Sequence, residues 1–277
     1  MEVNKCLSVY FSPYGGTRKN AELIIKSIRE NAGLTPETAA KTENLDLLRD
    51  PLRETKIVEG GCLSIVCVPV YAGRVPAPAV EMLRRLKGQN TPAMAVVVYG
   101  NRDYDDALAE LTDLLGENGF LVFGAAALLA EHSIFPEVAK GRPDEKDADS
   151  INSFVKKFLE KLHKFDITKD LDSSPIEVKG QRPYKEPGAV PIKPQVSKKC
   201  SNCGICASLC PVSAIDKADC RNFDKERCIS CAACIRNCPK SARAFKGPVY
   251  AVAAAGFKGK CSERREAEVF VYPQGTP

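Results

Sequence analysis

Apolar runs alternate with helix-period segments along the first 165 residues of the chain. Continuous apolar runs predict buried strands, and apolar residues spaced three and four apart predict helices. The predicted strands are residues 6–11, 62–70, 93–99 and 120–129, with a poorly patterned one within residues 38–45. The predicted helices are residues 17–31, 78–87, 104–115 and 147–163. Strands buried on both faces and joined by crossover helices predict an α/β fold with a doubly wound, parallel five-stranded sheet.

The alternation of apolar runs and helix-period segments ends between about Lys169 and Lys199, where the chain contains five prolines. Such a segment is a semi-rigid linker, and its Tyr184, Val190 and Ile192 are apolar enough to lie on a domain surface. The chain is therefore divided into an α/β domain, a linker, a small cysteine-rich domain and a C-terminal extension. Their predicted bounds are residues 1–165, 166–198, 199–246 and 247–277.

Length and composition agree with this division. A chain of 277 residues is long for one domain and natural for two. With 44% hydrophobic and 27% charged residues it is typical of globular proteins, which excludes wholesale disorder. The longest apolar runs, residues 120–130 and 249–257, are too short to span a bilayer. Because residues 6–11 are too short for a secretory apolar region, we expect a cytoplasmic protein.

The 13 cysteines are distributed unevenly, and most lie between residues 200 and 238. Clustering of this kind in a reducing compartment favours metal binding over disulfides. Cys6, Cys62 and Cys67 fall in predicted strands and are expected to be small core residues. Cys261 lies in a polar stretch, and the sequence leaves its role open.

The clustered cysteines form an internal repeat. The sequence C-S-N-C-G-I-C-A-S-L-C-P at residues 200–211 recurs 28 positions later as C-I-S-C-A-A-C-I-R-N-C-P at residues 228–239. In the pattern C-x2-C-x2-C-x3-C-P, three thiolates hold three corners of one iron–sulfur cube, and the fourth ligates the other cluster. Structural zinc prefers isolated C-x2-C pairs and is the weaker alternative. The predicted ligand sets are Cys200, Cys203, Cys206 and Cys238 for one 4Fe-4S cluster, and Cys228, Cys231, Cys234 and Cys210 for the other.

These motifs resemble the bacterial two-cluster ferredoxins over about residues 198–246. The resemblance implies a small ferredoxin-like domain that transfers single electrons between partners. Cys220 lies between the motifs and is expected not to be a ligand, because both cubes are complete without it.

Charge is also uneven along the chain. Residues 1–150 carry 17 Lys and Arg against 22 Asp and Glu, whereas the remainder carries 23 against 13. Basic residues can indicate nucleic-acid binding. Here they are interleaved with cluster ligands, and each oxidised cluster with four thiolates carries a net charge of about −2. We therefore expect no nucleic-acid partner.

A second candidate site follows the first predicted strand. The loop S-P-Y-G-G-T, residues 12–17, leads into a helix and offers free backbone N–H groups to a phosphate. Ser12 and Thr17 add hydroxyl donors, and Gly15 and Gly16 permit a tight wrap. A plain strand-to-helix turn is the alternative interpretation.

Two further loops lie where parallel α/β sheets bind ligands, beyond the carboxyl ends of neighbouring strands. These are P-V-Y-A-G-R at residues 69–74 and Y-G-N-R-D-Y at residues 99–104. Tyr71 or Tyr104 can stack on a flat ring, and Arg74 can oppose charge on a reduced flavin, although each tyrosine can equally be a half-buried loop aromatic. The predicted FMN-binding residues are Ser12, Tyr14, Gly15, Gly16, Thr17, Tyr71, Ala72, Gly73, Arg74, Tyr99, Gly100, Asn101 and Tyr104.

This arrangement resembles flavodoxin. The loop at residues 12–17 is similar to the flavodoxin phosphate loop S/T-x-T-G-x-T, with Tyr14 in place of the second hydroxyl residue. Across its whole length the chain resembles the EFR-family ferredoxins of anaerobic bacteria. The resemblance implies FMN and two 4Fe-4S clusters in one polypeptide, and it names no substrate.

Three functional readings remain open. The leading one is an electron-transfer protein that passes single electrons between the clusters, FMN and a redox partner protein. A second is an FMN-dependent oxidoreductase that reduces a small molecule such as a quinone or an enone. No separate G-x-G-x-x-G is present for a nicotinamide cofactor, and His132, the best acid–base candidate, is more readily structural. The third is a flavin-free ferredoxin whose α/β half only binds a partner protein.

Overall fold

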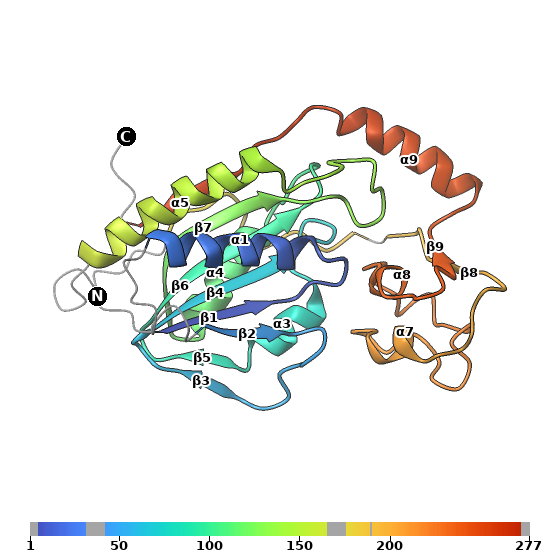
Figure 1. Cartoon of the computed structure of the whole chain (residues 1–277), viewed down its shortest axis with the longest axis horizontal. Helices are drawn as coiled ribbons and strands as arrows, with labels where there is room; N and C mark the ends of the chain where they lie inside the picture. The colour runs from blue at the N-terminus through green and yellow to red at the C-terminus, as the bar shows by residue number, and fades with distance from the viewer. Residues whose placement is uncertain (1–4, 32–41, 165–175, 189, 273–277) are drawn as a thin grey trace.

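The computed structural model describes residues 5–31, 42–164, 176–188 and 190–272. Its centre is a six-stranded sheet with the order β10-β7-β6-β4-β1-β2 (Figure 1). Neighbouring strands from β2 to β7 pair in parallel, and their sequence order, 2-1-3-4-5, is that of flavodoxin-like folds. The predicted α/β, doubly wound parallel sheet is thus confirmed. The strands are β1 (Lys5–Tyr10), β2 (Thr42–Asp46), β4 (Cys62–Pro69), β6 (Thr91–Tyr99), β7 (Phe120–Leu129) and β10 (Glu268–Val271).

Two helix pairs cover the sheet. Helices α1 (Gly16–Asn31) and α5 (Glu145–Lys164) pack on one face, and α3 (Ala77–Leu83) and α4 (Ala107–Glu117) on the other. Strands β4 and β6 are buried at every residue, which explains their uninterrupted apolar sequences. Cys6, Cys62 and Cys67 are buried in these layers, as expected.

Short elements differ from the sequence-based prediction. The helix expected at residues 78–87 ends at Leu83, and residues Leu86–Gly88 instead form β5, which pairs with β3 (Lys56–Val58). Strands of three residues are too short to show a period of two. The second strand lies at Thr42–Asp46 rather than wholly within residues 38–45, and residues 32–41 lie outside the described part.

The described linker segment, residues 176–188, packs against α4. Asp106 accepts hydrogen bonds from the backbone N–H groups of Gln181 and Lys185, each at 2.8 Å. Arg182 forms an ion pair with Asp113 at 2.6 Å. A Cβ atom on Gly180 would lie 2.6 Å from the Cβ of Ala109, so the two backbones are closely packed. This described segment is therefore held against the sheet domain rather than free.

The C-terminal extension returns to the sheet domain. Helix α9 (Pro248–Lys260) packs Tyr250 and Phe257 on Phe135, with ring centroids 5.7 and 4.9 Å apart. Strand β10 then pairs antiparallel with β7, which adds a sixth strand to the five that the sequence predicts. No helix in the described ranges has the length and hydropathy of a membrane span.

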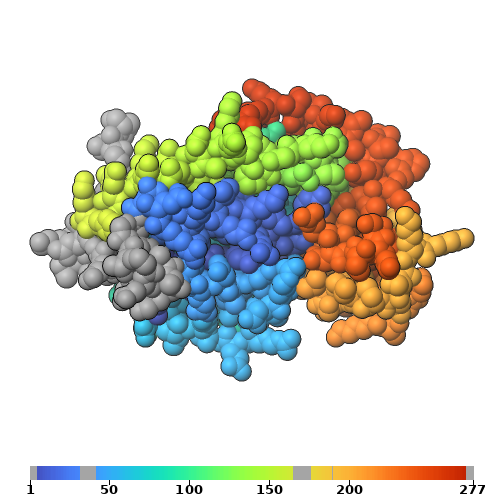
Figure 2. Space-filling model, viewed as in Figure 1, coloured from blue at the N-terminus to red at the C-terminus, as the bar shows by residue number. Residues whose placement is uncertain are grey.

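The cysteine-rich part, residues 190–247, lies beyond the carboxyl ends of the parallel strands (Figure 1) and packs against the sheet domain (Figure 2). We call it the cysteine module. It contains the two-residue strands β8 (Gln195–Val196) and β9 (Arg243–Ala244), which pair antiparallel. Its helices, α7 (Ile205–Ser208) and α8 (Ala233–Arg236), occupy equivalent places in the two sequence repeats. The module is therefore tied to the sheet domain at both ends, through the linker and through α9.

Candidate functional site: a cysteine module over a phosphate-type loop

The first predicted ligand set lies around one hollow of the cysteine module. Cys200, Cys203, Cys206 and Cys238 all line this hollow, so the fourth cysteine comes from the other repeat. Cys203 is exposed, whereas Cys206 is buried. Gly204, which begins α7, has a φ of +81°, a left-handed conformation that suits glycine.

The second predicted set also lies together. Burial, followed by the charges of Cys234, Cys210 and Cys228, raises the pKa of the Cys231 thiol to about 12. These three neighbours are the other members of its predicted set. The hollow around the first set agrees with a fourth ligand from the other repeat, and ligation itself stays a prediction. In the described part of the chain, no His, Cys, Asp and Glu side chains converge closely enough to hold a single metal ion.

The two repeats hold their fourth cysteines in the same way. The backbone N–H of Ala214 donates to Sγ of Cys210, and that of Ala242 donates to Sγ of Cys238, both at 3.2 Å. Hydrogen bonds to sulfur stabilise a thiolate and tune the reduction potential of an iron–sulfur cluster.

Cys220, which belongs to neither predicted ligand set, is buried beside Cys206 in the first hollow.

The phosphate-type loop connects β1 to α1. Gly15 has a φ of +107°, and a Cβ atom on Gly16 would lie 2.6 Å from the Cβ of Ala130, so only glycine fits this approach to β7. The hydroxyl oxygen of Ser12 accepts the backbone N–H of Arg18 at 2.9 Å and thereby holds the loop at the helix start. The first N–H groups of an α-helix have no partner within the helix. The loop is therefore a preformed cradle for an anion.

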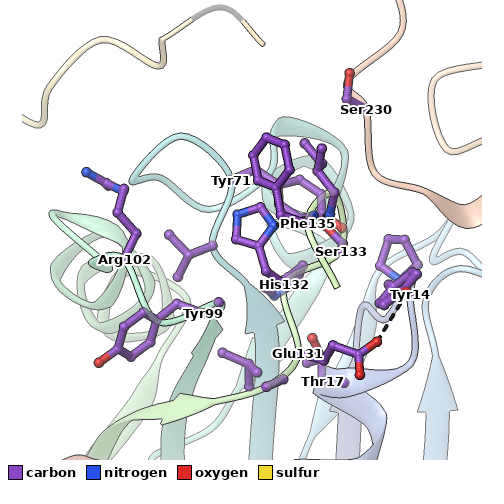
Figure 3. A pocket seen from close by; sticks show the side chains of 18 of the residues that line it. Tyr14, Thr17, Tyr71, Tyr99, Arg102, Glu131, His132, Ser133, Phe135 and Ser230 are labelled. Atoms are coloured by element: carbon purple, nitrogen blue, oxygen red, sulfur yellow. Dashed lines mark hydrogen bonds between the residues drawn. The ribbon is translucent and has the colours of Figure 1, made fainter. Parts of the chain in front are cut away.

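A cavity of about 230 Å³ opens next to this loop, at the carboxyl ends of the parallel strands. Figure 3 shows Tyr71, His132 and Phe135 close together on one side and Tyr14 with Glu131 on the other. Of the predicted residues, those that line it are Tyr14, Gly15, Gly16, Thr17, Tyr71, Ala72, Tyr99 and Gly100.

Five predicted residues do not line this cavity. Tyr104 is fully buried, and its hydroxyl donates to Glu268 at 2.6 Å, because β10 covers that side of the sheet. Arg74 pairs with Glu110 at 2.8 Å on α4, and Gly73 packs against Asp105. Asn101 binds the backbone carbonyls of Cys261 and Glu263 at 2.9 and 2.8 Å, and Ser12 caps the loop. Of the two tyrosines considered for stacking, the structure therefore places Tyr71 at the cavity and Tyr104 away from it, and Arg74 pairs with Glu110 instead of lining the cavity.

Other residues take those places in the cavity. Arg102 lines the wall in place of Arg74. Gly100 is covered by His132, since a Cβ atom on Gly100 would lie 2.6 Å from Cδ2 of His132. Pro13, Pro69, Val70 and Arg102 lie in the loops that the sequence indicated but were not among the predicted residues. No sequence signal pointed to the wall residues that end β6, follow β7 or come from remote segments. They are Val98, Ala130, Glu131, Ser133, Ile134, Phe135, Val190, Ile229, Ser230 and Phe257.

His132 has a structural role, as the sequence favoured. Its Nδ1 accepts the backbone N–H groups of Ile134 and Phe135, both at 3.1 Å. Burial and then the positive charge of Arg102 lower the pKa of His132 to about 4. At neutral pH it is therefore an uncharged wall residue that packs against Phe257, with ring centroids 4.8 Å apart.

The cysteine module closes the cavity from above. Ile229 and Ser230, which lie between Cys228 and Cys231, line the cavity together with the phosphate-type loop. The hydroxyl of Tyr71 donates to the carbonyl of Cys231 at 3.4 Å. Arg236 of α8 lies near Gly15, with its Nε 3.9 Å from the place of a Cβ atom on that glycine. One predicted cluster therefore adjoins the cavity.

The residues present fit an FMN. The glycine cradle and Arg236 suit a phosphate, and the apolar and aromatic wall suits a flat ring. Glu131, an acidic wall residue, accepts a hydrogen bond from the Tyr14 hydroxyl at 3.3 Å. Burial and Glu131 raise the pKa of Tyr14, and the nearby Arg236 opposes this shift.

A family profile, Fer4, described as a 4Fe-4S binding domain, matches residues 196–216. No curated protein sequence matches the chain. One similar solved structure is rubredoxin oxygen:oxidoreductase from the anaerobe Desulfovibrio gigas, with 16% identity, 58% of this chain and 37% of that chain covered, and a TM-score of 0.41. The chain thus spans about a third of that protein.

Two flavodoxins are also similar. One, from the domain Archaea, has 16% identity, a TM-score of 0.37 and coverage of 57% of this chain and 99% of that chain. The other, from Streptococcus pneumonia TIGR4, has 14% identity, a TM-score of 0.39 and the same coverage. The fold assignment itself rests on the strand order. The chain therefore combines a flavodoxin-like α/β sheet with a 4Fe-4S binding domain.

Proposed function

We propose that this protein is an electron-transfer flavo-iron-sulfur protein. In this proposal it passes single electrons between two 4Fe-4S clusters, a bound FMN and a redox partner protein. The eight cysteines of the two predicted sets hold the clusters, and the loop at residues 12–17 holds the FMN phosphate. The sequence resemblance to EFR-family ferredoxins, which implies the same cofactors, supports this assignment.

One observation carries the proposal: the cysteine module and the phosphate-type loop line the same cavity. Residues 229–230 close the cavity, and they stand between two predicted ligands of one cluster. The hydrogen bond from Tyr71 to the Cys231 carbonyl joins the cavity wall to that ligand segment. If the sheet domain and the cysteine module exchanged electrons only with separate external partners, the two parts would not need to line one cavity.

Each residue group has a defined task in this proposal. When bound, FMN exchanges electrons singly or in pairs, and each cluster exchanges them singly. Backbone N–H groups of Gly15 and Gly16 bind the phosphate, and Arg236 adds a positive charge. Val70, Val98 and Phe135 exclude water from the cavity. Tyr71 fixes the module over the cavity through its hydrogen bond to the Cys231 carbonyl. Within the module, the Ser230 hydroxyl donates to the carbonyl of Ile192 at 2.7 Å and holds the segment that lines the cavity.

Intramolecular electron transfer between a cluster and FMN can be tested by cutting the chain so that the cysteine module is released from the sheet domain. A protease site after Gly188 lies in an exposed part of the linker with open space around the glycine. That cut alone leaves the module attached through α9 and β10, so a second site before Gly247 is needed to release it. The single cut is therefore the matched control for the double cut.

The experiment reduces the clusters by flash photolysis and follows flavin bleaching at several protein concentrations. The intact and singly cut chains should show one rate that is independent of dilution, because a short tether gives an effective concentration on the order of mM. The doubly cut protein should show a slower rate that depends on concentration and salt. Second-order behaviour of the intact chain would contradict the proposal. Turnover of a small acceptor with NAD(P)H as the sole reductant would favour a substrate-specific oxidoreductase, and absence of flavin from the purified protein would favour the flavin-free scaffold.

A further inference from the structure

Arg243 is a buried cation at the centre of the cysteine module. It belongs to β9, and only 3% of the residue is exposed. Its Nη2 donates to the carbonyl of Cys220, and its guanidinium lies 5.5 Å from the centroid of the Phe223 ring. A second guanidinium nitrogen, Nη1, is buried with no hydrogen-bond partner among the described residues. A donor left unpaired in a low-dielectric interior is costly.

The neighbours of Arg243 include cysteines from both predicted ligand sets. Its side chain lines the hollow of Cys200, Cys203, Cys206 and Cys238. Cys206 of that set packs in one buried cluster with Cys234 of the other set, so the guanidinium lies close to both sets. None of the carboxylates in the described ranges forms an ion pair with it. Among the described residues, the groups beside this cation that can carry negative charge are therefore the cysteine sulfurs and what they bind.

We propose that Arg243 is the shared counter-cation of the two iron–sulfur clusters and raises the reduction potential of both. The inference rests on the two-cluster part of the proposed function. A cluster with four thiolates carries a charge of about −2 when oxidised and gains one more negative charge on reduction. A fixed positive charge in a low-dielectric site stabilises the reduced cluster more than the oxidised cluster, because the reduced cluster is more negative. Removing it makes both clusters harder to reduce.

Arg221 provides a matched control within the same module. Its Nη2 donates to the carbonyl of Cys200 at 2.9 Å, so it also lies beside a predicted ligand. Unlike Arg243, it is exposed and pairs with Asp219 at 3.5 Å. Water and this carboxylate screen its charge. Arg221→Met should therefore change the potentials much less.

The test compares Arg243→Met, Arg243→Lys and Arg221→Met in the full-length protein, purified without oxygen. Iron content is measured first, and the midpoint potentials are then obtained by EPR-monitored redox titration. We expect Arg243→Met to lower the reduction equilibrium constant of both clusters at least tenfold, which is about 59 mV for a one-electron couple. Arg243→Lys keeps the charge and should stay within about threefold of wild type, and Arg221→Met within about twofold.

Each result of these measurements either supports or contradicts a role of Arg243 at both clusters. Unchanged potentials in Arg243→Met, or a change confined to one cluster, would overturn the shared role. If Arg243→Met cannot retain iron, Arg243→Lys separates charge from shape: retention of both clusters by the lysine variant supports the inference, and equal loss in both variants overturns it. A protein without flavin would contradict the proposed function and leave this measurement intact.

Discussion

Every residue of β4 and β6 in the sheet is buried, whereas the buried cluster of the cysteine module consists of Cys206, Ala207, Ile215, Cys220 and Cys234. A buried Val, Leu or Ile side chain stabilises a fold by about 1.5–3 kcal/mol. The sheet has many such side chains on both faces, and the module has few. The comparison indicates that apolar burial specifies the first region and that metal ligation must specify the second.

Removal of iron should separate the two regions most strongly. If the clusters replace an apolar core, anaerobic chelation will abolish protection of the module and leave the sheet folded. We expect amide hydrogen exchange within residues 199–246 to accelerate at least 100-fold, with β4 and β6 unchanged. Unaltered protection of the module after iron removal would show that its small apolar core suffices.

Exchange of single ligands sharpens the same comparison inside the module. Cys210→Ser should release the cluster held by Cys228, Cys231 and Cys234, although Cys210 is closer in sequence to the other set. The measurement is alkylation of exposed thiols, mapped by mass spectrometry after anaerobic purification. Cys220→Ser is the control and should retain both clusters. Labelling of Cys200 and Cys203 in the Cys210→Ser protein would contradict the crossed arrangement.

In the sheet domain, FMN binding should depend on the shape of the loop at residues 12–17 rather than on metal ligands. Gly16→Val should weaken FMN binding more than tenfold, since a Cβ atom there meets Ala130 at 2.6 Å and the cradle must shift. Thr17→Ala removes one hydroxyl and should cost about 0.5–1.5 kcal/mol. Flavin titration of the apoprotein measures both values. Gly116→Ala, where the side chain meets open space, is the control. Equal affinities for all three variants would argue against a phosphate at this loop.

The smallest expected effect concerns His132, at the boundary between the two regions. Its pKa in the folded protein is about 4, below the unfolded value of roughly 6.5. The unfolded chain therefore binds the proton more tightly, and the stability is present above pH 6.5 and lost as the pH falls toward 4. Between pH 7.5 and 5.5 the free energy of unfolding should fall by about 1 kcal/mol through this group.

Urea unfolding of wild type and His132→Asn at the two pH values measures this contribution. The wild type should lose about 1 kcal/mol more than the variant between pH 7.5 and 5.5. The exposed His163→Gln is the control and should keep the wild-type difference. An identical pH dependence in all three proteins would show that His132 is accessible to protons in the folded state.

Much of the architecture could be predicted because it depends on local patterns. Continuous apolar runs gave β4, β6 and β7 within two residues of their observed ends. The three-residue strands β3 and β5 could not be predicted, because their length carries no period. Strand β10 has the β-branched and aromatic residues of a strand but only four positions, and its place in the sheet depends on pairing with the remote β7.

The residues of the candidate site were also predicted only in part. The sequence placed Gly15, Gly16 and Tyr71 at the cavity because they follow strands whose ends meet at one edge of the sheet. It also placed Arg74 and Tyr104 there, and the structure directs them to Glu110 and Glu268. Which side of a loop faces a cavity depends on the segments packed against it. Those segments, the linker and β10, are remote in sequence.

The sequence by itself determined the alternation of strands and helices, the loop at residues 12–17 and the two cysteine repeats, because each depends on short-range pattern or fixed spacing. Only the tertiary structure decided that the module lies over the loop, with Ile229 and Ser230 in the cavity wall and Arg243 buried in the hollow that Cys206 lines. Docking of this kind arises from contacts between segments far apart in the chain, such as Tyr71 with Cys231. No local periodicity records such contacts, since each partner contributes only one or two residues.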